Sequence, residues 1–362
     1  MRVINVTYIV RNLDGSGGIQ YFAKNTSDSI NRKNIQVNLL TWRSPLSLLQ
    51  EILVRIMPKL ISKKIYPTWF TQNIDDFLLE KDWDIIHFWH VKSAMALMDS
   101  MSLPYVLTCH GSEILRPFVP DYQYAKFINA LKNASAIIAN SRYTRDYLIK
   151  EYGINKEMIS VINPGIDVRR FGSKKINANT TPKIGTLTRL IPRKNVINII
   201  KALELLKTRG VDFNYYLAGT GSLVNRLKIL TRLKRSRINW HYLGKISNEI
   251  KESEFYPSLD VFVLPPLEMP KDIEGFGIVF LEANASGVPV VAADTGGVGD
   301  AVKSGFSGLF ADPRDPEDIA EKIYEVLKSR KNYEKTAKQW AENFSQEKTA
   351  KQFQAVYEKV KN

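Results

Sequence analysis

Two glutamates, Glu274 and Glu282, are separated by seven residues, and glycines follow the first of them. If a helix begins near Gly277, Glu274 lies just before its N-terminus and Glu282 lies within it. The free backbone N–H groups of a helix N-terminus suit an anion such as a phosphate. One carboxylate can then accept hydroxyls beyond the phosphate, and the other can accept the hydroxyls of a ribose. The alternative is an N-capping acid followed by a solvated glutamate.

The residues around this pair predict where they lie in a fold. An apolar helical segment, 278–281, is followed by a break of small residues at 285–287. A short buried strand is expected at 288–293, and a second glycine turn at 295–297. This order of loop, helix, strand and loop places both glycine turns at one end of a parallel sheet. Open α/β sheets bind their ligands at that end.

Two cations form a second candidate group. Arg189 and Lys194 are five residues apart, between an expected strand at 183–187 and a helix at 195–208. Cations at such a junction can hold a diphosphate from two sides. The alternative is a solvated basic loop, and Arg193 is an extra charge to which the sequence assigns no role.

Glycine turns follow two further expected strands. Gly17 and Gly18 lie between a strand at 2–10 and a helix at 19–31, a geometry in which a backbone can approach a phosphate. It is not the dinucleotide fingerprint, because Gln20 occupies the third glycine position, and this argues against a nicotinamide oxidoreductase. The alternative is a tight turn. Gly219 and Gly221 form the turn after a strand at 213–218.

A histidine follows the strand expected at 105–109. His110 stands directly before Gly111, at the edge of the sheet where ligands bind. It is either a structural hydrogen-bonding residue or part of a site. The four histidines and Cys109 show no metal-ligand spacing, so no metal is expected.

The string from Asp272 to Ala283 resembles the retaining glycosyltransferases of the GT-B fold, in particular glycosyltransferase family 4. The hallmark of that family is two glutamates separated by seven residues, with Gly-Phe-Gly after the first. The resemblance covers nearly the whole chain and is specific mainly from 185 to 302. It implies an α/β fold of two Rossmann-like domains facing across a cleft, with a C-terminal helix crossing back to the first domain.

The resemblance also implies the division of the chain. Residues 1–168, with the C-terminal helix 346–362, would form the acceptor-binding domain. Residues 169–181, which are polar and basic, would form the linker. Residues 182–345 would bind the nucleotide-sugar.

The resemblance assigns roles to the candidate residues. Glu274 would hold the sugar hydroxyls and Glu282 the ribose, while Arg189 and Lys194 neutralise the leaving diphosphate. The catalytic set it implies is His110, Arg189, Lys194 and Glu274. The donor-binding set it implies is Gly17, Gly18, Gly219, Gly221, Gly244, Lys245, Gly275, Phe276, Gly277, Ile278, Val279 and Glu282. No carboxylate nucleophile is evident, so attack by the acceptor on the leaving-group face is favoured over double displacement.

The activity implied is transfer of a sugar from a UDP- or GDP-sugar, with retention of configuration and no cofactor. The acceptor would be a lipid-linked or cell-envelope glycan. A small soluble acceptor is the alternative within this class. A nucleotide-sugar hydrolase or a phosphorylase is also considered, but the chain is short for a phosphorylase and shows no lysine motif that would anchor its cofactor.

Composition agrees with a two-domain globular protein. The chain has 362 residues, of which 44% are hydrophobic and 24% charged. The single cysteine excludes an internal disulfide and favours a reducing compartment. No apolar run reaches the roughly 18–20 residues that a membrane span requires. We expect a cytoplasmic protein, with peripheral contact at the inner face of the cell membrane.

The net charge of +14 is concentrated between residues 169 and 237, which hold 17 Lys or Arg and two acids. Such a region favours nucleotide diphosphates, an acidic membrane or nucleic acid. Nucleic-acid binding would need aromatic side chains among the cations, and the few present lie in expected strand or linker positions, so no nucleic-acid partner is expected. The basic amphipathic stretch 44–69 either packs on its own domain or lies on a membrane surface.

Overall fold

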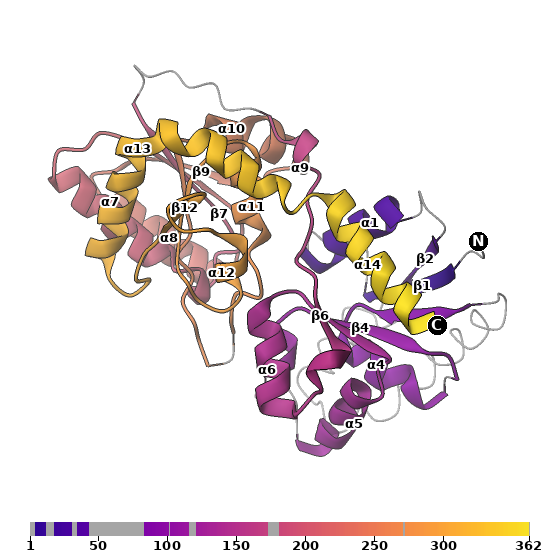
Figure 1. Cartoon of the computed structure of the whole chain (residues 1–362). Helices are drawn as coiled ribbons and strands as arrows, with labels where there is room; N and C mark the ends of the chain where they lie inside the picture. The colour runs from indigo at the N-terminus through magenta and orange to yellow at the C-terminus, as the bar shows by residue number, and fades with distance from the viewer. Residues whose placement is uncertain are drawn as a thin grey trace. The chain divides into compact units, whose positions relative to one another are not determined.

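The computed structural model describes residues 4–11, 18–30, 35–42, 83–100, 102–115, 121–172, 181–270 and 272–361. Gly17 and the basic stretch 44–69 lie outside these residues. The chain divides into two compact units (Figure 1). Unit 1 comprises Met1–Asn140, Arg145–Ile162 and Thr349–Asn362, and unit 2 comprises Ser141–Thr144 and Asn163–Lys348.

Unit 1 is built on a parallel sheet of six strands in the order β2-β1-β3-β4-β5-β6. The strands are β1 (Ile4–Arg11), β2 (Ile35–Trp42), β3 (Ile85–Phe88), β4 (Tyr105–Cys109), β5 (Ala136–Ala139) and β6 (Ile159–Val161). The helices are α1 (Gly18–Ile30), α4 (Val91–Leu97), α5 (Asp121–Lys132), α6 (Arg142–Tyr152) and α14 (Gln346–Lys361), with 3₁₀ turns at Met98–Ser100, Ser112–Ile114 and Lys156–Met158.

Alternate residues of the unit 1 strands enter two separate cores, as the period of two in a β-strand requires. On β5, Ile137 lies in the core beneath α4, α5 and α6, and Ile138 lies in the core beneath α1 and α14. The C-terminal helix belongs to the second of these cores. Its Phe353 stacks on Trp89, with ring centroids 5.6 Å apart. The sheet is therefore covered by helices on both faces.

Unit 2 repeats this plan with a parallel sheet in the order β12-β11-β10-β7-β8-β9. The strands are β7 (Lys183–Leu187), β8 (Asn214–Ala218), β9 (Asn239–Gly244), β10 (Val261–Val263), β11 (Val290–Ala292) and β12 (Gly308–Phe310). The helices are α7 (Val196–Thr208), α8 (Leu223–Arg235), α9 (Asn248–Ile250), a π-helix (Lys251–Phe255), α10 (Tyr256–Ser258), α11 (Ile278–Ala285), α12 (Val298–Ala301) and α13 (Pro316–Glu342), with 3₁₀ turns at Val168–Arg170 and Pro192–Lys194.

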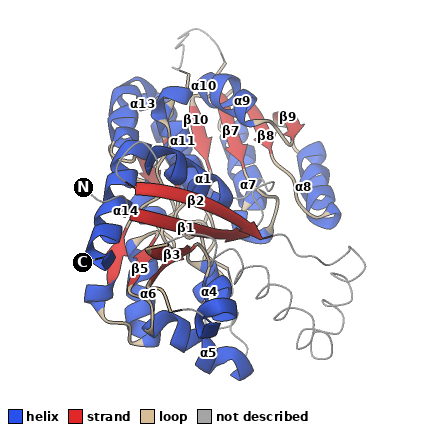
Figure 2. Ribbon diagram, turned by 90° about the vertical axis from the view of Figure 1, so that its right-hand side faces the viewer, coloured by secondary structure: helices blue, strands red, loops and turns tan. Residues whose placement is uncertain are grey.

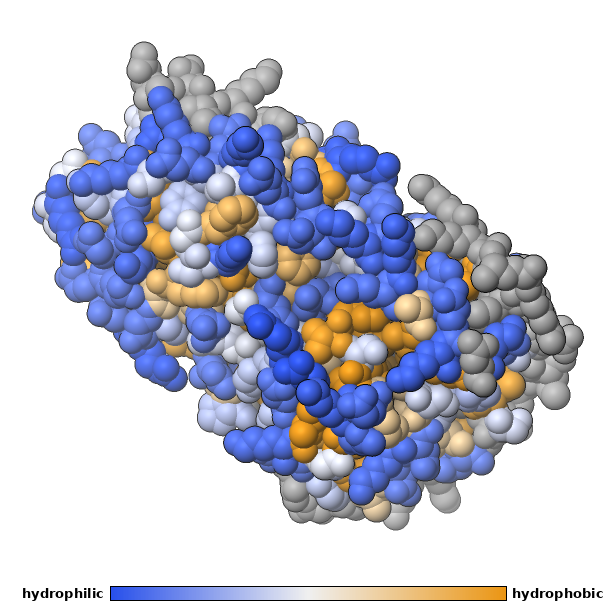
Figure 3. Space-filling model, in the orientation of Figure 1, coloured by the Kyte–Doolittle hydropathy of each residue, from blue (hydrophilic) through white to orange (hydrophobic). Residues whose placement is uncertain are grey.

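The unit 2 strands also alternate between two cores. Val261 and Val263 of β10 pack beneath α7, α8 and the first half of α13, whereas Phe262 packs beneath α10, α11 and α12. Figure 2 shows helices on both sides of these strands. Hydrophilic residues dominate the molecular face drawn in Figure 3, with smaller hydrophobic areas between them. The expected α/β class with two parallel sheets is confirmed.

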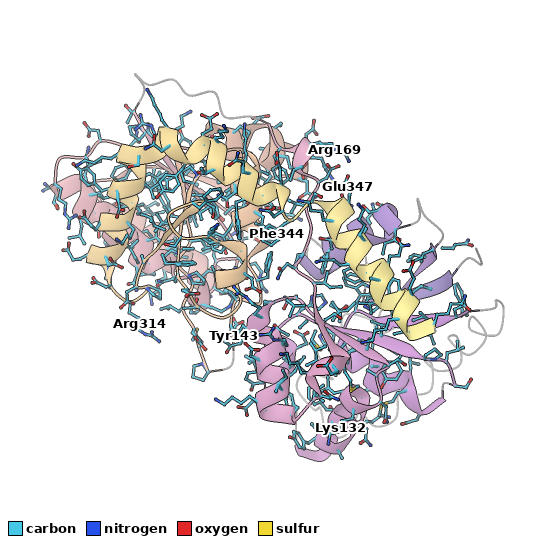
Figure 4. All side chains as sticks on the ribbon, viewed as in Figure 1. Lys132, Tyr143, Arg169, Arg314, Phe344 and Glu347 are labelled. Carbon is cyan, nitrogen blue, oxygen red and sulfur yellow. The ribbon has the colours of Figure 1, made fainter. Side chains whose placement is uncertain are left out.

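Helix α13 runs unbroken from Pro316 to Glu342, because no glycine and no further proline interrupts it. One detail of the expected layout differs in the structure. The first part of the expected linker belongs to unit 2, because Phe171 is 6% exposed and packs in that core. Nearby, Arg169 pairs with Glu347 at 3.3 Å (Figure 4).

None of the described helices is long and apolar enough to span a membrane.

Candidate active site

The candidate residues of unit 2 gather at the carboxyl edge of its sheet. Because all the strands are parallel, the loops after β7, β8, β9, β10 and β11 leave the sheet at the same edge. These loops contain nearly every site residue that the sequence predicts in this unit. The exceptions are Gly244, which ends β9, and Ile278, Val279 and Glu282, which lie in α11.

The loop after β7 and the turn after β8 are interlocked. The Leu190 N–H donates to the Thr220 carbonyl at 2.7 Å. A Cβ atom on Gly219 would lie 1.7 Å from the Thr188 carbonyl oxygen, and one on Gly221 would lie 2.3 Å from that of Leu190. The two predicted glycines are therefore needed so that the backbones can approach each other.

The end of β9 joins the same group. The Gly219 N–H donates to the Gly244 carbonyl at 2.6 Å, and the Tyr242 hydroxyl donates to the Gly219 carbonyl at 2.9 Å. Gly244 has a φ of +63°, which favours glycine. Lys245 follows with an exposed side chain.

Glu274 is the centre of a buried ion-pair network. Its Oε2 accepts from the Arg193 guanidinium at 2.7 Å and also from the Lys194 ammonium. Arg193 extends to Asp272 as well, with Nε 2.9 Å from Oδ1. Arg193 is 3% exposed and Lys194 is 8% exposed. The network joins the loop after β7 to the loop before α11.

The charges of this network determine its protonation. Burial by itself would raise the pKa of Glu274, but the charges and hydrogen bonds of Lys194 and Arg193 outweigh burial and lower it to about 2. Burial lowers the pKa of Lys194, and Glu274 opposes that shift. At neutral pH Glu274 is thus a carboxylate held in place by two cations.

A strained residue positions these cations. Asn195, the N-cap of α7, has a φ of +59° and is the only non-glycine residue with a positive φ in the described ranges. Its side-chain amide donates to the carbonyls of Pro265 at 3.0 Å and Pro313 at 2.6 Å. The Arg193 carbonyl accepts from the Leu267 N–H at 2.8 Å. Backbone strain of this kind is frequent at functional sites.

Arg189 differs from both cations of the network. It lies in the same loop, but its side chain is exposed, and no described residue pairs with its guanidinium. Its five N–H donors can therefore bind a carboxylate or phosphate ligand without first breaking an ion pair.

The two glycine turns that flank α11 and β11 lie at one end of the sheet, as the sequence predicts, and they contact each other. The Gly297 N–H donates to the Glu274 carbonyl at 2.8 Å. A Cβ atom on Gly296 would lie 2.4 Å from the Glu274 carbonyl oxygen, and one on Gly297 would lie 2.0 Å from that of Gly275. The turn at 295–297 thus supports the loop that carries Glu274.

The N-terminus of α11 follows this loop directly. Gly277, its N-cap, has a φ of +91°. The N–H groups of Ile278 and Val279 have no acceptor inside the helix, and no described residue accepts from them. Phe276 is 3% exposed and its ring packs on Phe344, with centroids 5.9 Å apart. These amides, beside Glu274, are suited to bind an anion.

Glu282 occupies a different environment from Glu274. It is 2% exposed. Its Oε1 accepts from the Lys251 ammonium at 2.6 Å, and its Oε2 accepts from the Tyr256 hydroxyl at 2.8 Å. Each carboxylate oxygen has a second lone pair, so these bonds leave further acceptor capacity.

The candidate residues of unit 1 are His110, Gly17 and Gly18. Gly17 lies outside the described residues, and Gly18 is the first residue of α1. His110 Nε2 lies 3.0 Å from the Trp89 carbonyl oxygen. Because a carbonyl only accepts, Nε2 carries the proton and Nδ1 is left with a lone pair. Burial lowers the pKa of His110 to about 4, so the ring is neutral at pH 7.

Sequence reasoning did not identify several residues of these sites. The sequence assigns no role to Arg193, and it gives Asp272 none beyond its place in the motif. No local pattern marks Asn195, Lys251 or Tyr256. The adjacent Arg193-Lys194 pair is a sequence signal that could have identified Arg193. No sequence signal identifies the partners of Glu282, because they lie 26 and 31 residues away along the chain.

Comparisons with known proteins agree with this geometry. The sequence model of the glycosyl transferases group 1 matches residues 168–346, and that of Glycosyltransferase Family 4 matches residues 16–170. An uncharacterised glycosyltransferase of Methanocaldococcus jannaschii is 28% identical over 73% of this chain and 71% of its own length.

Two further proteins are similar. One is a GDP-mannose-dependent alpha-(1-6)-phosphatidylinositol monomannoside mannosyltransferase of Mycobacterium tuberculosis, which is 28% identical. The match covers 52% of this chain and 52% of the relative, so the chain spans about half the length of that protein. The solved structure of Anabaena HepE in complex with UDP-glucose superposes with a TM-score of 0.74 at 19% identity, covering 98% of this chain and 100% of that one.

The two parallel-sheet α/β units and the superposition on HepE are those of the GT-B fold. The two sequence models overlap at residues 168–170 and together extend from residue 16 to residue 346. The chain therefore belongs to glycosyltransferase family 4, the glycosyl transferases group 1.

Proposed function

We propose that this protein transfers a sugar from a nucleotide-sugar to a hydroxyl of a lipid-linked or cell-envelope glycan, with retention of anomeric configuration. The observation that carries the proposal is the state of Glu274. Two buried cations keep it ionised at a helix N-terminus, and the same loop carries Arg189, which pairs with no described residue. A fixed carboxylate beside anion-binding groups matches a donor that carries sugar hydroxyls next to a diphosphate.

The diphosphate would be bound by groups that are free to receive it. Arg189 has no ion pair with any described residue, and Lys194 keeps two N–H donors besides the one given to Glu274. The amides of Ile278 and Val279 add the positive end of α11. These preorganised donors would stabilise the charge that develops as the diphosphate leaves. In this mechanism the protein supplies the neutralising charge, and we expect no metal requirement.

The carboxylate of Glu274 would accept the hydroxyls of the transferred sugar. Glu282 would accept the ribose hydroxyls through the lone pairs that Lys251 and Tyr256 leave free. His110, neutral and with Nδ1 unprotonated, would accept one further sugar hydroxyl. Gly219, Gly221, Gly244 and Lys245 would border the nucleotide.

The chemical step is a substitution at the anomeric carbon. The bond from this carbon to the phosphate oxygen breaks, and its electron pair leaves with the nucleoside diphosphate. The acceptor hydroxyl oxygen forms the new bond on the same face, and its proton passes to the departing phosphate oxygen. This route gives retention without a carboxylate nucleophile.

The donor and acceptor classes rest on the relatives. One relative's name specifies GDP-mannose and a phosphatidylinositol mannoside, and the Anabaena structure contains UDP-glucose. These names support a UDP- or GDP-sugar and a lipid-linked acceptor. The basic stretch 44–69 is proposed as a peripheral membrane contact for such an acceptor.

The test begins with thermal unfolding in the presence of UDP-, GDP-, ADP- and dTDP-sugars. A donor that binds only the folded protein raises the melting temperature. The selected donor is then used in transfer or donor-hydrolysis assays with and without EDTA. We expect Arg189→Ala to reduce kcat/KM about 100-fold, because one preorganised donor to the developing charge is lost.

Lys201→Ala is the matched control. Lys201 is an exposed cation on α7, the helix that follows the site loop, and its loss changes the net charge by the same amount. Unchanged turnover in Arg189→Ala would contradict the proposed role. Loss of activity in EDTA, restored by a divalent cation, would contradict the metal-independent mechanism.

A further inference from the structure

Helix α8 presents a face to solvent that is apolar at one end and cationic at the other. Val224, Leu227, Lys228, Lys234 and Arg235 are all exposed. Their spacing of three, four and seven residues puts them along one side of a helix. Val224 is 75% exposed and Leu227 is 54% exposed, the two highest values for large hydrophobic side chains among the described residues.

This face carries positive charge that the described protein does not neutralise. Helix α8 holds Arg226, Lys228, Arg232, Lys234 and Arg235 and no acidic residue. Arg232 pairs with Glu204, but no described residue pairs with the other exposed cations of the face. An opposing charge from a partner would therefore be favourable here.

A cavity opens next to the same face. Its volume is 280 Å³, and it is lined by Leu227, Leu230, Thr231, Lys234, Trp240 and Tyr242. Two aromatic rings of β9 thus face aliphatic side chains of α8, with one ammonium group beside them. Figure 2 shows α8 beside β9, the edge strand of the unit 2 sheet. Of these residues only Tyr242 contacts the proposed donor site, through its hydroxyl bond to the Gly219 carbonyl.

We propose that this face, which we name the α8 face, docks on an anionic phospholipid bilayer. Leu227 and Val224 would enter the boundary between headgroups and acyl chains, and the cations of the second half of the helix would meet lipid phosphates. Aliphatic side chains beside cations distinguish a bilayer from a nucleic acid. Single strands are bound by exposed aromatic rings on which bases stack, whereas the exposed side chains of this face are aliphatic.

The experiment uses a probe that reports this face alone, so any second membrane contact does not affect the result. The only native thiol, Cys109, is fully buried, so an introduced cysteine can be labelled selectively. Leu227→Cys is labelled with an environment-sensitive fluorophore. Lys331→Cys, at an exposed position of α13, is the matched control.

The labelled protein is mixed with vesicles of phosphatidylcholine alone, or of phosphatidylcholine with about one third phosphatidylglycerol. With the anionic vesicles we expect a blue shift and brighter emission at position 227, reversed by high salt. We expect no change at position 331 and none with neutral vesicles. An emission at 227 that does not respond, even if the protein sediments with the vesicles, would overturn the proposal.

Charge reversal gives a second measurement that needs no label. Lys228→Glu with Lys234→Glu should weaken co-sedimentation with anionic vesicles at least about tenfold, whereas Lys331→Glu with Lys335→Glu should change it less than about twofold. Thermal melting checks that each variant is folded. If the 227 label responds to single-stranded RNA and not to vesicles, the surface binds nucleic acid and the membrane proposal is wrong.

Discussion

At the scale of single residues, Glu274 matters through its charge, because it is the counter-ion of two buried cations. Arg193 and Lys194 would lose most of their compensation if that charge were removed. The same carboxylate is the proposed acceptor of the sugar hydroxyls. If the proposal holds, stability and sugar transfer depend on one group, and a single substitution can separate the two effects.

Glu274→Gln preserves the size of the side chain and removes its charge. We expect the free energy of unfolding to fall by about 3 kcal/mol, because buried cations are left unpaired. Sugar transfer should fall at least about 100-fold. Affinity for the free nucleoside diphosphate should be kept or increased, because Lys194 is released to bind phosphate.

Urea unfolding, calorimetric titration with UDP or GDP and a transfer assay measure these three quantities. Glu249→Gln, at an exposed glutamate of α9, is the control and should change none of them. Loss of nucleotide affinity in proportion to loss of transfer would show that Glu274 acts on the diphosphate and not on the sugar.

At the scale of elements, the two glycine turns at the sheet edge act as one support. Gly297 has φ −90° and ψ 7°, which alanine can adopt, so a substitution tests only the space around its Cβ. In Gly297→Ala that atom would lie 2.0 Å from the Gly275 carbonyl oxygen. We expect a loss of about 1–3 kcal/mol in stability from the forced displacement. Donor affinity should fall with it, because the Glu274 loop must move.

Gly305→Ala is the matched control for this prediction. Gly305 has a φ of +74°, and a Cβ atom there would meet nothing within 4 Å. The Gly305→Ala variant should lose about 1 kcal/mol of stability through backbone strain alone, and its donor affinity should be unchanged. Equal donor affinities in both variants would show that the turn at 295–297 does not position Glu274.

At the scale of the whole molecule, the C-terminal helix and the unit 1 sheet share a buried polar contact. His87 is fully buried, with Nδ1 2.7 Å from the Tyr357 hydroxyl of α14 and Nε2 2.7 Å from the Thr108 hydroxyl. Burial, with a smaller effect of His110, holds the pKa of His87 well below its usual value. Unit 1 therefore contains two histidines that are neutral when folded.

This arrangement predicts a loss of stability in mild acid. The unfolded chain protonates both histidines near pH 6.5, whereas the pKa of folded His110 is about 4. The unfolded state then binds more protons, so stability falls as the pH drops from about 6.5 towards 4. Glu113 acts in the opposite direction, because burial raises its pKa to about 7 and its stabilising effect is lost as the pH rises from 4.5 through 7.

Urea unfolding should show that the free energy of unfolding of the wild type is about 1–3 kcal/mol lower at pH 5 than at pH 7. His110→Gln should make this decrease smaller, and Glu113→Gln should make it larger. His241→Gln, at an exposed histidine, is the control. The prediction would be contradicted if the wild type had the same free energy of unfolding at both pH values and the Glu113→Gln variant did too.

The sequence by itself determined several of the described elements and the residues that mark the family. Strands β4 and β7 occupy the expected residues, and α11 begins directly after Gly277. These features depend on local periodicity and on turn chemistry, which neighbouring residues specify. The spacing of Glu274 and Glu282, with the glycines after the first, also identified the family.

Only the tertiary structure decided what each charge does. Arg189 and Arg193 have the same side chain in one loop, yet Arg193 is buried against Glu274, 81 residues away, and Arg189 is exposed. Glu274 and Glu282 likewise belong to one motif but bind different cations. Such pairings depend on desolvation and on long-range geometry, which chain packing sets and local sequence does not.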